Sequence, residues 1–359
     1  MAEVLVDREG EFTMGFDLRC SASGTALLAA SFGALLVFAP VPRADAAVIG
    51  GVNLGNLTDY LFFFSNGSDD ANWQGSSKGY VGDVAVDGIE AVERTSGTVP
   101  YAGTIVTNDD PLGVWQDIVA DNPGQASANL GQGATISGLE TDLSNAFTSI
   151  NGLSATAGFS NRSAASLNTL DTQNGLAETF VINITSGFSG ISSLINITGD
   201  SDDAFILRWD DDLATAGYQG QVKFQSGGGI NPLGGLTAAN FVHVAGNINA
   251  SGGGSNPSGL AGPLAEIDAI NGGTAVNGGG FFTGYWLTTG DPSNGDNASL
   301  SNAIFVGGWY TTADKFSLTS GTSGVHVPPP ESVDEGATLG LLGLGLAGIG
   351  LAARRRARL

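Results

Sequence analysis

Two pairs of internal repeats constrain the fold of this 359-residue chain more than any other feature. Residues Tyr80–Asp87 align with Tyr101–Asn108, and residues Phe281–Asp291 align with Ile304–Asp314. Both periods lie in the low twenties, which is the length of one coil in a β-solenoid, where each coil buries its inward side chains on the next. We therefore predict a mainly β fold of stacked coils. A β-sandwich of hairpins is the alternative, because two repeat pairs do not exclude it.

Short apolar runs bounded by glycine and polar turn residues extend the β prediction to the rest of the chain. Examples are Phe180–Ile184, Ala204–Trp209 and Phe241–Ile248, each of which has the length and composition of a strand. The number of such runs argues against disorder, although the chain contains 56 glycines.

One segment breaks the β pattern. Ser137–Glu140 has the residues of a helix capping box, with serine at the N-cap and glutamate three positions later. We predict an amphipathic helix over Leu139–Asn151, laid along the β body, because apolar residues recur at helical spacing. We expect a connecting loop over Asn161–Asn174, with a short strand around Ala165–Leu170. The apolar residues of the predicted helix face are Leu139, Leu143, Ala146, Phe147, Ile150 and Leu153.

The C-terminal region has three parts. A proline segment, Val325–Glu331, opens a linker over residues 325–336, which also contains the acidic stretch Ser332–Glu335. The uncharged run Ala337–Ala353 follows; it is at the short end of the length that crosses a bilayer as a helix, and a buried core helix is the alternative. An arginine cluster directly after such a run stays on the cytoplasmic side, so residues 337–359 predict a membrane stop with the preceding chain exported. The cluster comprises Arg354, Arg355, Arg356 and Arg358.

The N-terminal 46 residues predict a secretory signal peptide. The apolar stretch within Thr25–Pro40 is followed by Ala44, Asp45 and Ala46, an A-x-A pattern that places cleavage before Ala47. The acidic residues before Met14 are unusual for such a peptide, and translation starting at Met14 would remove them. An uncut signal anchor is the alternative. In either case residues 47–324 form the exported body.

The arrangement of the C-terminal parts resembles the PEP-CTERM sorting signal of Gram-negative envelope proteins, with a proline motif, a Gly/Leu-rich helix and terminal arginines. The matching motif consists of Val327, Pro328, Pro329, Pro330 and Glu331, and Ser332 stands where the family has proline. The resemblance implies processing by an exosortase in the inner membrane and delivery to the outer surface or matrix.

The body also resembles known exported domains. Gly55–Thr58 and Gly79–Gly88, then a lone helix and Thr179–Ile184, are similar to the "choice-of-anchor A" domains. The same order of β coils, side helix and β coils is similar to the bacterial ice-binding β-helix family. These resemblances imply a right-handed β-solenoid with one helix packed alongside.

The formal net charge of −22 limits the partners of the chain. Nucleic acid is excluded as a partner, because binding phosphates requires clustered lysine and arginine. Neutral glycans, other extracellular polysaccharides and cations remain as candidate partners. No cofactor is required by any motif, but calcium would fit the closely spaced oxygen ligands Asp200, Asp202 and Asp203.

Catalytic motifs are missing from the sequence, and its two histidines are His243 and His326. His243 alternates with Val242 and Val244, so we expect it on the outer face of a strand. We therefore expect a protein that is not an enzyme. A carbohydrate-active enzyme with paired carboxylates on a β-helix is an alternative.

The second repeat pair also suggests a ligand face. Exposed tryptophan and tyrosine can stack on sugars, and threonines in register can form the flat surface used by ice-binding solenoids. The competing interpretation is that the aromatic residues fill the last coils. The candidate ligand face comprises Trp286, Thr288, Thr289, Trp309, Tyr310, Thr311 and Thr312.

Together these features predict an exported, envelope-sorted, non-catalytic protein with a structural or adhesive role at the cell surface or in the biofilm matrix of a Gram-negative bacterium. Its expected partners are the secretion machinery, an exosortase-type enzyme, the inner membrane transiently, and extracellular polysaccharide. An ice-binding or glycan-binding β-solenoid module is the main alternative function.

Overall fold

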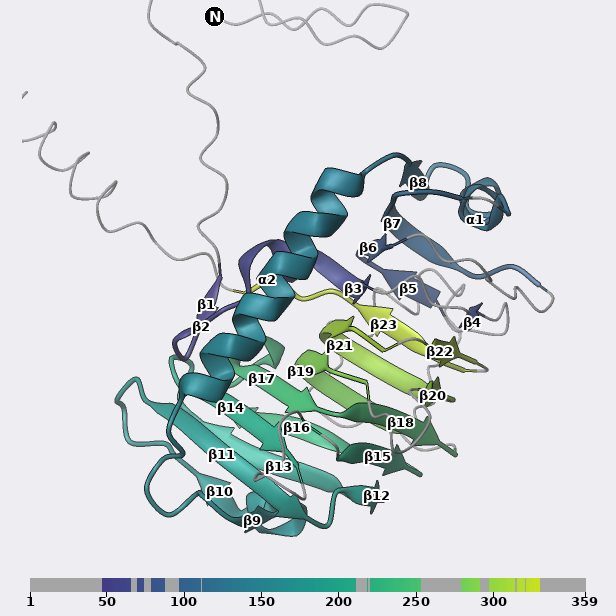
Figure 1. The fold of residues 1–359 in the computed structure, drawn as a ribbon. Helices are drawn as coiled ribbons and strands as arrows, with labels where there is room; N and C mark the ends of the chain where they lie inside the picture. Colours follow the sequence, from purple (N-terminus) through teal and green to yellow (C-terminus); the bar gives the residue numbers. More distant parts are fainter. Residues whose placement is uncertain are drawn as a thin grey trace, which may run out of the picture. The chain divides into compact units, whose positions relative to one another are not determined.

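The computed structural model describes residues 47–65, 70–73, 79–87, 97–110, 112–210, 218, 220–252, 279–290, 297–313, 315–319 and 321–329. This part of the chain is mainly β with few helices (Figure 1). None of the helices in these ranges has the length and apolar character needed to cross a membrane. The predicted signal peptide, the last two residues of the sorting motif and the predicted C-terminal helix lie outside the described residues.

Fifteen strands form the larger sheet. Eight of them follow one another along the face that carries the long helix: β3 (Tyr60–Phe64), β6 (Asp83–Val86), β7 (Tyr101–Thr107), β11 (Thr179–Ser186), β14 (Ala204–Trp209), β17 (Phe241–Ala245), β19 (Gly280–Thr288) and β21 (Ala303–Thr311). The others are β5 (Gly79–Val81), β8 (Ala126–Asn129), β9 (Arg162–Ser163), β10 (Leu170–Asp171), β13 (Leu194–Gly199), β16 (Gly228–Gly234) and β23 (Ser323–Val325).

A second sheet of six strands runs beside the first. Its strands are β12 (Ser189–Ile191), β15 (Gln221–Gln225), β18 (Asn247–Ser251), β20 (Asn297–Leu300), β22 (Lys315–Leu318) and β4 (Asp70–Trp73). A small antiparallel pair, β1 (Val48–Ile49) and β2 (Val52–Asn53), precedes both sheets.

The strand register confirms the two repeat pairs. Val84 of β6 pairs with Ile105 of β7, and Trp286 of β19 pairs with Trp309 of β21, so equivalent repeat positions lie side by side. The recorded pairings within both large sheets are parallel, unlike the antiparallel hairpins of a sandwich. Successive turns of the chain therefore stack on one another, with equivalent residues in contact.

The stack does not follow the order of the chain. β21 pairs with β3, β22 with β4, and β23 with β5, so the first turns of the chain are stacked on the last. Along the larger sheet the order is β9–β11–β14–β17–β19–β21–β3–β6–β7. Residues near the two ends of the body thus form its middle, as the adjacent purple and yellow strands show (Figure 1).

The long helix α2 (Gly133–Gly152) returns the chain from one end of this stack to the other (Figure 1). Its 20 residues span about 30 Å. The seven strand spacings from β7 to β11 span about 34 Å, so the helix matches the height of the stack. Its buried side chains are Ile136, Leu139, Leu143, Ala146 and Ile150, which pack on outward apolar residues of the larger sheet.

Two details of the predicted helical region are wrong. The helix starts at Gly133, its N-cap is Gln132, and Ser137 lies inside it, so no capping box forms. The apolar stripe explains this, because Ile136 extends the buried side by one turn before Leu139. Most of the predicted strand around Ala165–Leu170 is the 3-10 helix η2 (Ala164–Thr169), in which Ala164 and Leu167 are buried one turn apart, and the short strand β10 begins only at Leu170.

Polar contacts fix α2 to the sheet. The Arg208 guanidinium donates to the carbonyl oxygens of Ile150 (3.3 Å) and Leu153 (3.0 Å), and it also donates to Asn183 Oδ1 (2.7 Å). A cation at this end is favourable, because the last carbonyls of a helix lack intrahelical partners. These bonds therefore hold the C-terminal end of α2 in a fixed position on the larger sheet.

A further shorter helix, α1 (Val114–Asp121), covers the end of the stack at β7 and β8, where Trp115 and Ile118 are buried. The 3-10 helices η1 (Gly55–Asp59) and η3 (Ala238–Asn240) precede β3 and β17.

Candidate functional site

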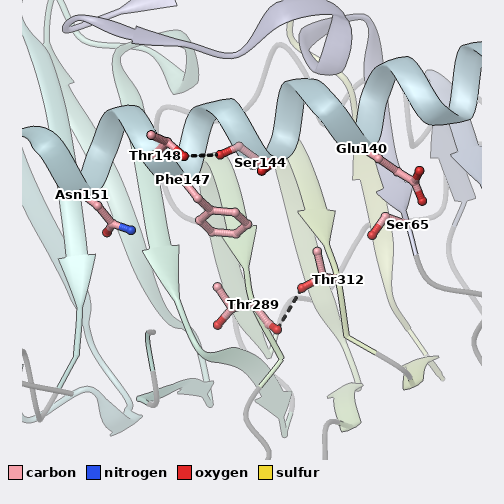
Figure 2. Close-up of a pocket in the computed structure, with 8 residues that line it drawn as sticks. All are labelled: Ser65, Glu140, Ser144, Phe147, Thr148, Asn151, Thr289 and Thr312. Atoms are coloured by element: carbon pink, nitrogen blue, oxygen red, sulfur yellow. Dashed lines mark hydrogen bonds between the residues drawn. The ribbon is translucent and has the colours of Figure 1, made fainter. Parts of the chain in front are cut away.

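A groove with a volume of about 500 Å³ lies between α2 and the ends of three adjacent strands, β19, β21 and β3 (Figure 2). This volume falls within the range of small-ligand sites in proteins. Seven of its eight lining residues are polar, and they include two of the threonines predicted for a ligand face. The lining residues are Ser65, Glu140, Ser144, Phe147, Thr148, Asn151, Thr289 and Thr312.

The strand side of the groove carries one hydroxyl per turn of the stack. Thr289, Thr312 and Ser65 directly follow β19, β21 and β3, and these strands are paired in register. Their backbone N–H groups continue the ladder by donating to carbonyl oxygens of the neighbouring turns, Ser65 for example to Thr311 (3.0 Å). The three hydroxyl-bearing residues therefore form a column with a spacing of about 4.8 Å.

The helix side carries a polar stripe. Glu140, Ser144, Thr148 and Asn151 lie three or four residues apart on α2, so they share one side of the helix. Figure 2 shows Phe147 between them, with its ring directed toward Thr289 and Thr312. The ring is only partly buried against the apolar contact between helix and sheet, so it forms the floor of the groove.

Three of the five hydroxyl groups in the lining donate their protons to backbone acceptors. Thr148 donates to the Ser144 carbonyl (3.0 Å), and Thr312 donates to the Thr289 carbonyl (2.9 Å). Thr289 donates to the Tyr218 carbonyl (3.1 Å). A hydroxyl whose proton is engaged retains acceptor capacity, so these threonines offer acceptors to the groove.

Two further groups set the polarity of the groove. Asn151 Oδ1 accepts a hydrogen bond from the Tyr218 hydroxyl (2.8 Å), which fixes the side-chain amide. Partial burial raises the pKa of the Glu140 carboxyl, and the charge of Asp87 raises it further. The arrangement is therefore rich in acceptors, with the Asn151 amide and the Ser65 and Ser144 hydroxyls as donors and one aromatic ring.

The expected ligand face is largely wrong, because five of its seven residues are buried. Trp286, Trp309 and Tyr310 lie in the apolar core, as the competing interpretation predicted. Thr288 and Thr311 are buried as well and bond to each other (2.7 Å), while the Trp309 indole donates to Thr288 (3.0 Å). They therefore form no exposed threonine surface, and of this set the groove contains only Thr289 and Thr312.

His243 is not on the outer face of its strand, contrary to the prediction, but fully buried. Its ring stacks on Trp286 at a centroid distance of 4.0 Å. Nδ1 accepts from the Trp209 indole (3.2 Å), so Nε2 carries the proton and donates to the Thr283 carbonyl (2.9 Å). Burial lowers the pKa of His243 to about 3, so the ring is neutral at pH 7. The alternation misled because α2 covers Val242 and Val244, which makes both faces of this strand buried.

The predicted calcium ligands hold a loop instead of meeting around a cation. Asp203 is buried and accepts from the Thr172 hydroxyl (2.7 Å) and from backbone N–H groups, including that of Glu178 (3.1 Å). Asp200 accepts from the backbone of Asn174 and Gly175, and Asp202 pairs with the neighbouring Ser201. Within the described ranges, no three acidic, histidine or cysteine side chains form a cluster that could hold a metal ion.

The predicted processing residues lie at the boundaries of the described chain. Ala47 is its first residue, and Val327, Pro328 and Pro329 are its last. The Val327 carbonyl accepts from the Tyr285 hydroxyl (2.6 Å), so the body holds this segment up to the predicted sorting motif. Ala44, Ala46, Pro330, Glu331, Arg354, Arg355, Arg356 and Arg358 lie outside the described residues.

Sequence reasoning missed most of the groove. The Thr-Thr repeat signalled Thr289 and Thr312, but Ser65 lies some 250 residues away in sequence and joins them only because the first turn stacks on the last. The helix residues had a weaker signal, because helical spacing identifies the apolar face but gives no partner for the polar side chains of the opposite face. Phe147 was assigned to the apolar face, whereas it lies at its edge.

Comparisons with known proteins give only distant similarities. No protein-family model and no curated protein matches the sequence. An ice-binding protein from an Antarctic bacterium, Flavobacteriaceae, is similar in structure with 15% sequence identity and a TM-score of 0.43 over 81% of this chain and 52% of that chain. The chain thus spans about half the length of that protein.

Two further solved structures are similar at 11% identity over 79% of this chain. One is an ice-binding protein from an Antarctic ascomycete, Antarctomyces psychrotrophicus, covered over 98% of its length with a TM-score of 0.37. The other is an ice-binding protein from an Antarctic biological consortium, covered over 96% with a TM-score of 0.36.

Proposed function

We propose that the chain is an exported, non-catalytic protein that acts at the cell surface or in the extracellular matrix of a Gram-negative bacterium. Its body is a right-handed β-solenoid with one helix alongside, and its role is structural or adhesive. The N-terminal signal directs export, and the C-terminal PEP-CTERM-like segment, processed by an exosortase-type enzyme, delivers the body to the outer surface.

The observation that carries the non-catalytic proposal is how the described titratable groups are used. Both ring nitrogens of His243 are bonded within the aromatic core, and the Asp203 carboxylate accepts from several donors that hold a loop. A general acid or base must instead reach a substrate proton. These groups stabilise a rigid scaffold, and the accessible feature is an open groove of hydroxyls, one amide, one ring and the carboxyl of Glu140. Among the described lining residues no second carboxyl stands beside it, whereas glycoside hydrolysis uses a pair.

The stacked arrangement supports the structural role. Parallel turns in register bury apolar side chains on each other along the whole stack, which produces a stiff body. A high negative charge keeps such a body soluble and limits self-association outside the cell.

Labelling of intact cells tests this proposal. A full-length copy with an epitope inserted in the segment 253–278 should be stained by antibody on unpermeabilised cells, and external protease should remove the signal. A cytoplasmic protein with the same epitope is the control and should be stained only after permeabilisation. Staining of the chain only after permeabilisation would refute the surface location.

A second candidate function, ice binding, is favoured by one observation. Three successive strands of the six-stranded sheet, β18, β20 and β22, present small, polar, half-exposed side chains at neighbouring positions, Asn249, Ser299 and Ser317. Polar side chains that repeat at the strand spacing suit a surface that holds water molecules in a regular array. An ice-recrystallisation assay with the purified protein tests it: crystals that coarsen as in a buffer control would eliminate this candidate.

A further inference from the structure

We propose that the groove between α2 and the ends of β19, β21 and β3 is a binding site for a neutral oligosaccharide. This inference deepens the adhesive role and rests on the protein being outside the cell, where such glycans occur. It assigns direct contacts with the ligand to the groove residues. The aromatic face that the repeats predicted does not serve this role, because its aromatic residues are buried.

The hydrogen-bonding state of the groove selects a ligand that donates. Thr148, Thr289 and Thr312 have given their protons to backbone carbonyls, so their oxygens accept. The Glu140 carboxylate also accepts. A sugar carries many hydroxyl donors at short spacing, and its ring and hydroxyl oxygens can accept from the Asn151 amide.

The aromatic ring and the dimensions fit the same class. Phe147 lies at the centre of the groove, with its ring toward the strand side (Figure 2). The C–H face of a sugar packs well on an aromatic ring. Glu140 and Asn151 are eleven residues apart on one helix, so the groove extends about 16 Å along α2 and accommodates several sugar units.

Charge selects neutral over acidic glycans. The chain carries a net charge of −22, and Glu140 and Asp87 are close enough to influence each other at one end of the groove. A polyuronate would bring further negative charge to this position at an electrostatic cost. A cation alone would satisfy the acceptors but would make no use of Phe147.

Isothermal titration calorimetry with the purified full-length protein tests the site. The probes are xylotetraose, cellotetraose and laminaritetraose as neutral ligands, tetragalacturonate as the acidic one, and calcium chloride alone. We expect saturable binding of at least one neutral tetrasaccharide and weaker or no binding of tetragalacturonate.

Variants locate the binding. Phe147→Ala should weaken it roughly three- to ten-fold, and Phe147→Tyr, which keeps a ring, should restore it. Thr312→Val removes one acceptor and should weaken binding by a similar factor. Thr319→Val is its matched control, because Thr319 also follows a strand and donates to a neighbouring carbonyl, that of Leu300 (3.1 Å), but lies outside the groove. Circular dichroism verifies that each variant is folded.

Several results would overturn the inference: no binding of any neutral tetrasaccharide, unchanged binding by Phe147→Ala, equal losses in the Thr312 and Thr319 variants, or stronger binding of tetragalacturonate or calcium. None of these bears on the surface location. Hydrolysis of a bound tetrasaccharide would instead contradict the non-catalytic proposal and leave the binding site standing.

Discussion

The buried histidine predicts a specific loss of stability in acid. His243 is fully buried, and its pKa is lowered from 6.5 to about 3 by burial. In the unfolded chain the ring takes up a proton as the pH falls below about 6.5. The folded protein does not until about pH 3, so protons favour the unfolded state throughout this interval. The contribution of His243 is therefore complete above pH 6.5 and declines as the pH falls.

The size of the effect follows from the pKa difference. Each pH unit between the two pKa values costs about 1.4 kcal/mol of unfolding free energy. From pH 7 to pH 5 the loss due to this residue is about 2 kcal/mol. Other groups also titrate here, including His326, whose pKa is lowered by burial, so the wild type must be compared with a variant lacking only this ring.

His243→Phe supplies that comparison, because phenylalanine preserves an aromatic ring against Trp286. The variant loses two hydrogen bonds and is therefore less stable at all pH values. Its free energy of unfolding no longer depends on the protonation of residue 243. Urea unfolding at pH 7 and pH 5 measures both proteins. The wild type should lose about 2 kcal/mol more than the variant over this interval. Equal losses would refute the assignment of a neutral, buried His243.

Three further substitutions test the scaffold by urea unfolding. Arg208→Met should cost about 1–3 kcal/mol, because the last carbonyls of α2 lose their donors, and an unchanged midpoint would contradict this role. Gly82→Ala should destabilise by more than about 1 kcal/mol, because this glycine has a φ of +131° and an added Cβ would collide with the His326 side chain. Asp203→Ala should cost about 1–3 kcal/mol, whereas Asp202→Ala at the exposed neighbour should change stability by less than about 0.5 kcal/mol; similar values for both would disprove the structural role of Asp203.

The β architecture could be predicted because its signal is local. The aligned repeats place the same kind of side chain at the same point of each turn, and Trp286 and Trp309 lie in register as their alignment implies. The long helix was predicted for the same reason, since its apolar periodicity is contained within one segment. Its true start at Gly133 was missed, because a short polar motif outweighed the continuing buried stripe at Ile136.

The groove could not be predicted, because it depends on contacts between distant parts of the chain. Ser65 becomes a neighbour of Thr312 only through the pairing of β3 with β21. The burial of His243 could not be predicted either, because α2 covers the face of β17 that carries Val242 and Val244. The opposite face of the strand, which carries His243, lies against Trp286 in the interior of the stack. Local patterns therefore predicted the elements, whereas the site arises from the non-sequential order of the stack.

The central claim is that this protein is exported, processed and displayed outside the cell. Intact-mass spectrometry of the protein recovered from the cell surface and medium tests it most directly. The account predicts a chain that begins at Ala47 and ends near Pro330, without the terminal arginines. Recovery of the chain only from the cytoplasm, with both terminal segments still attached, would contradict it.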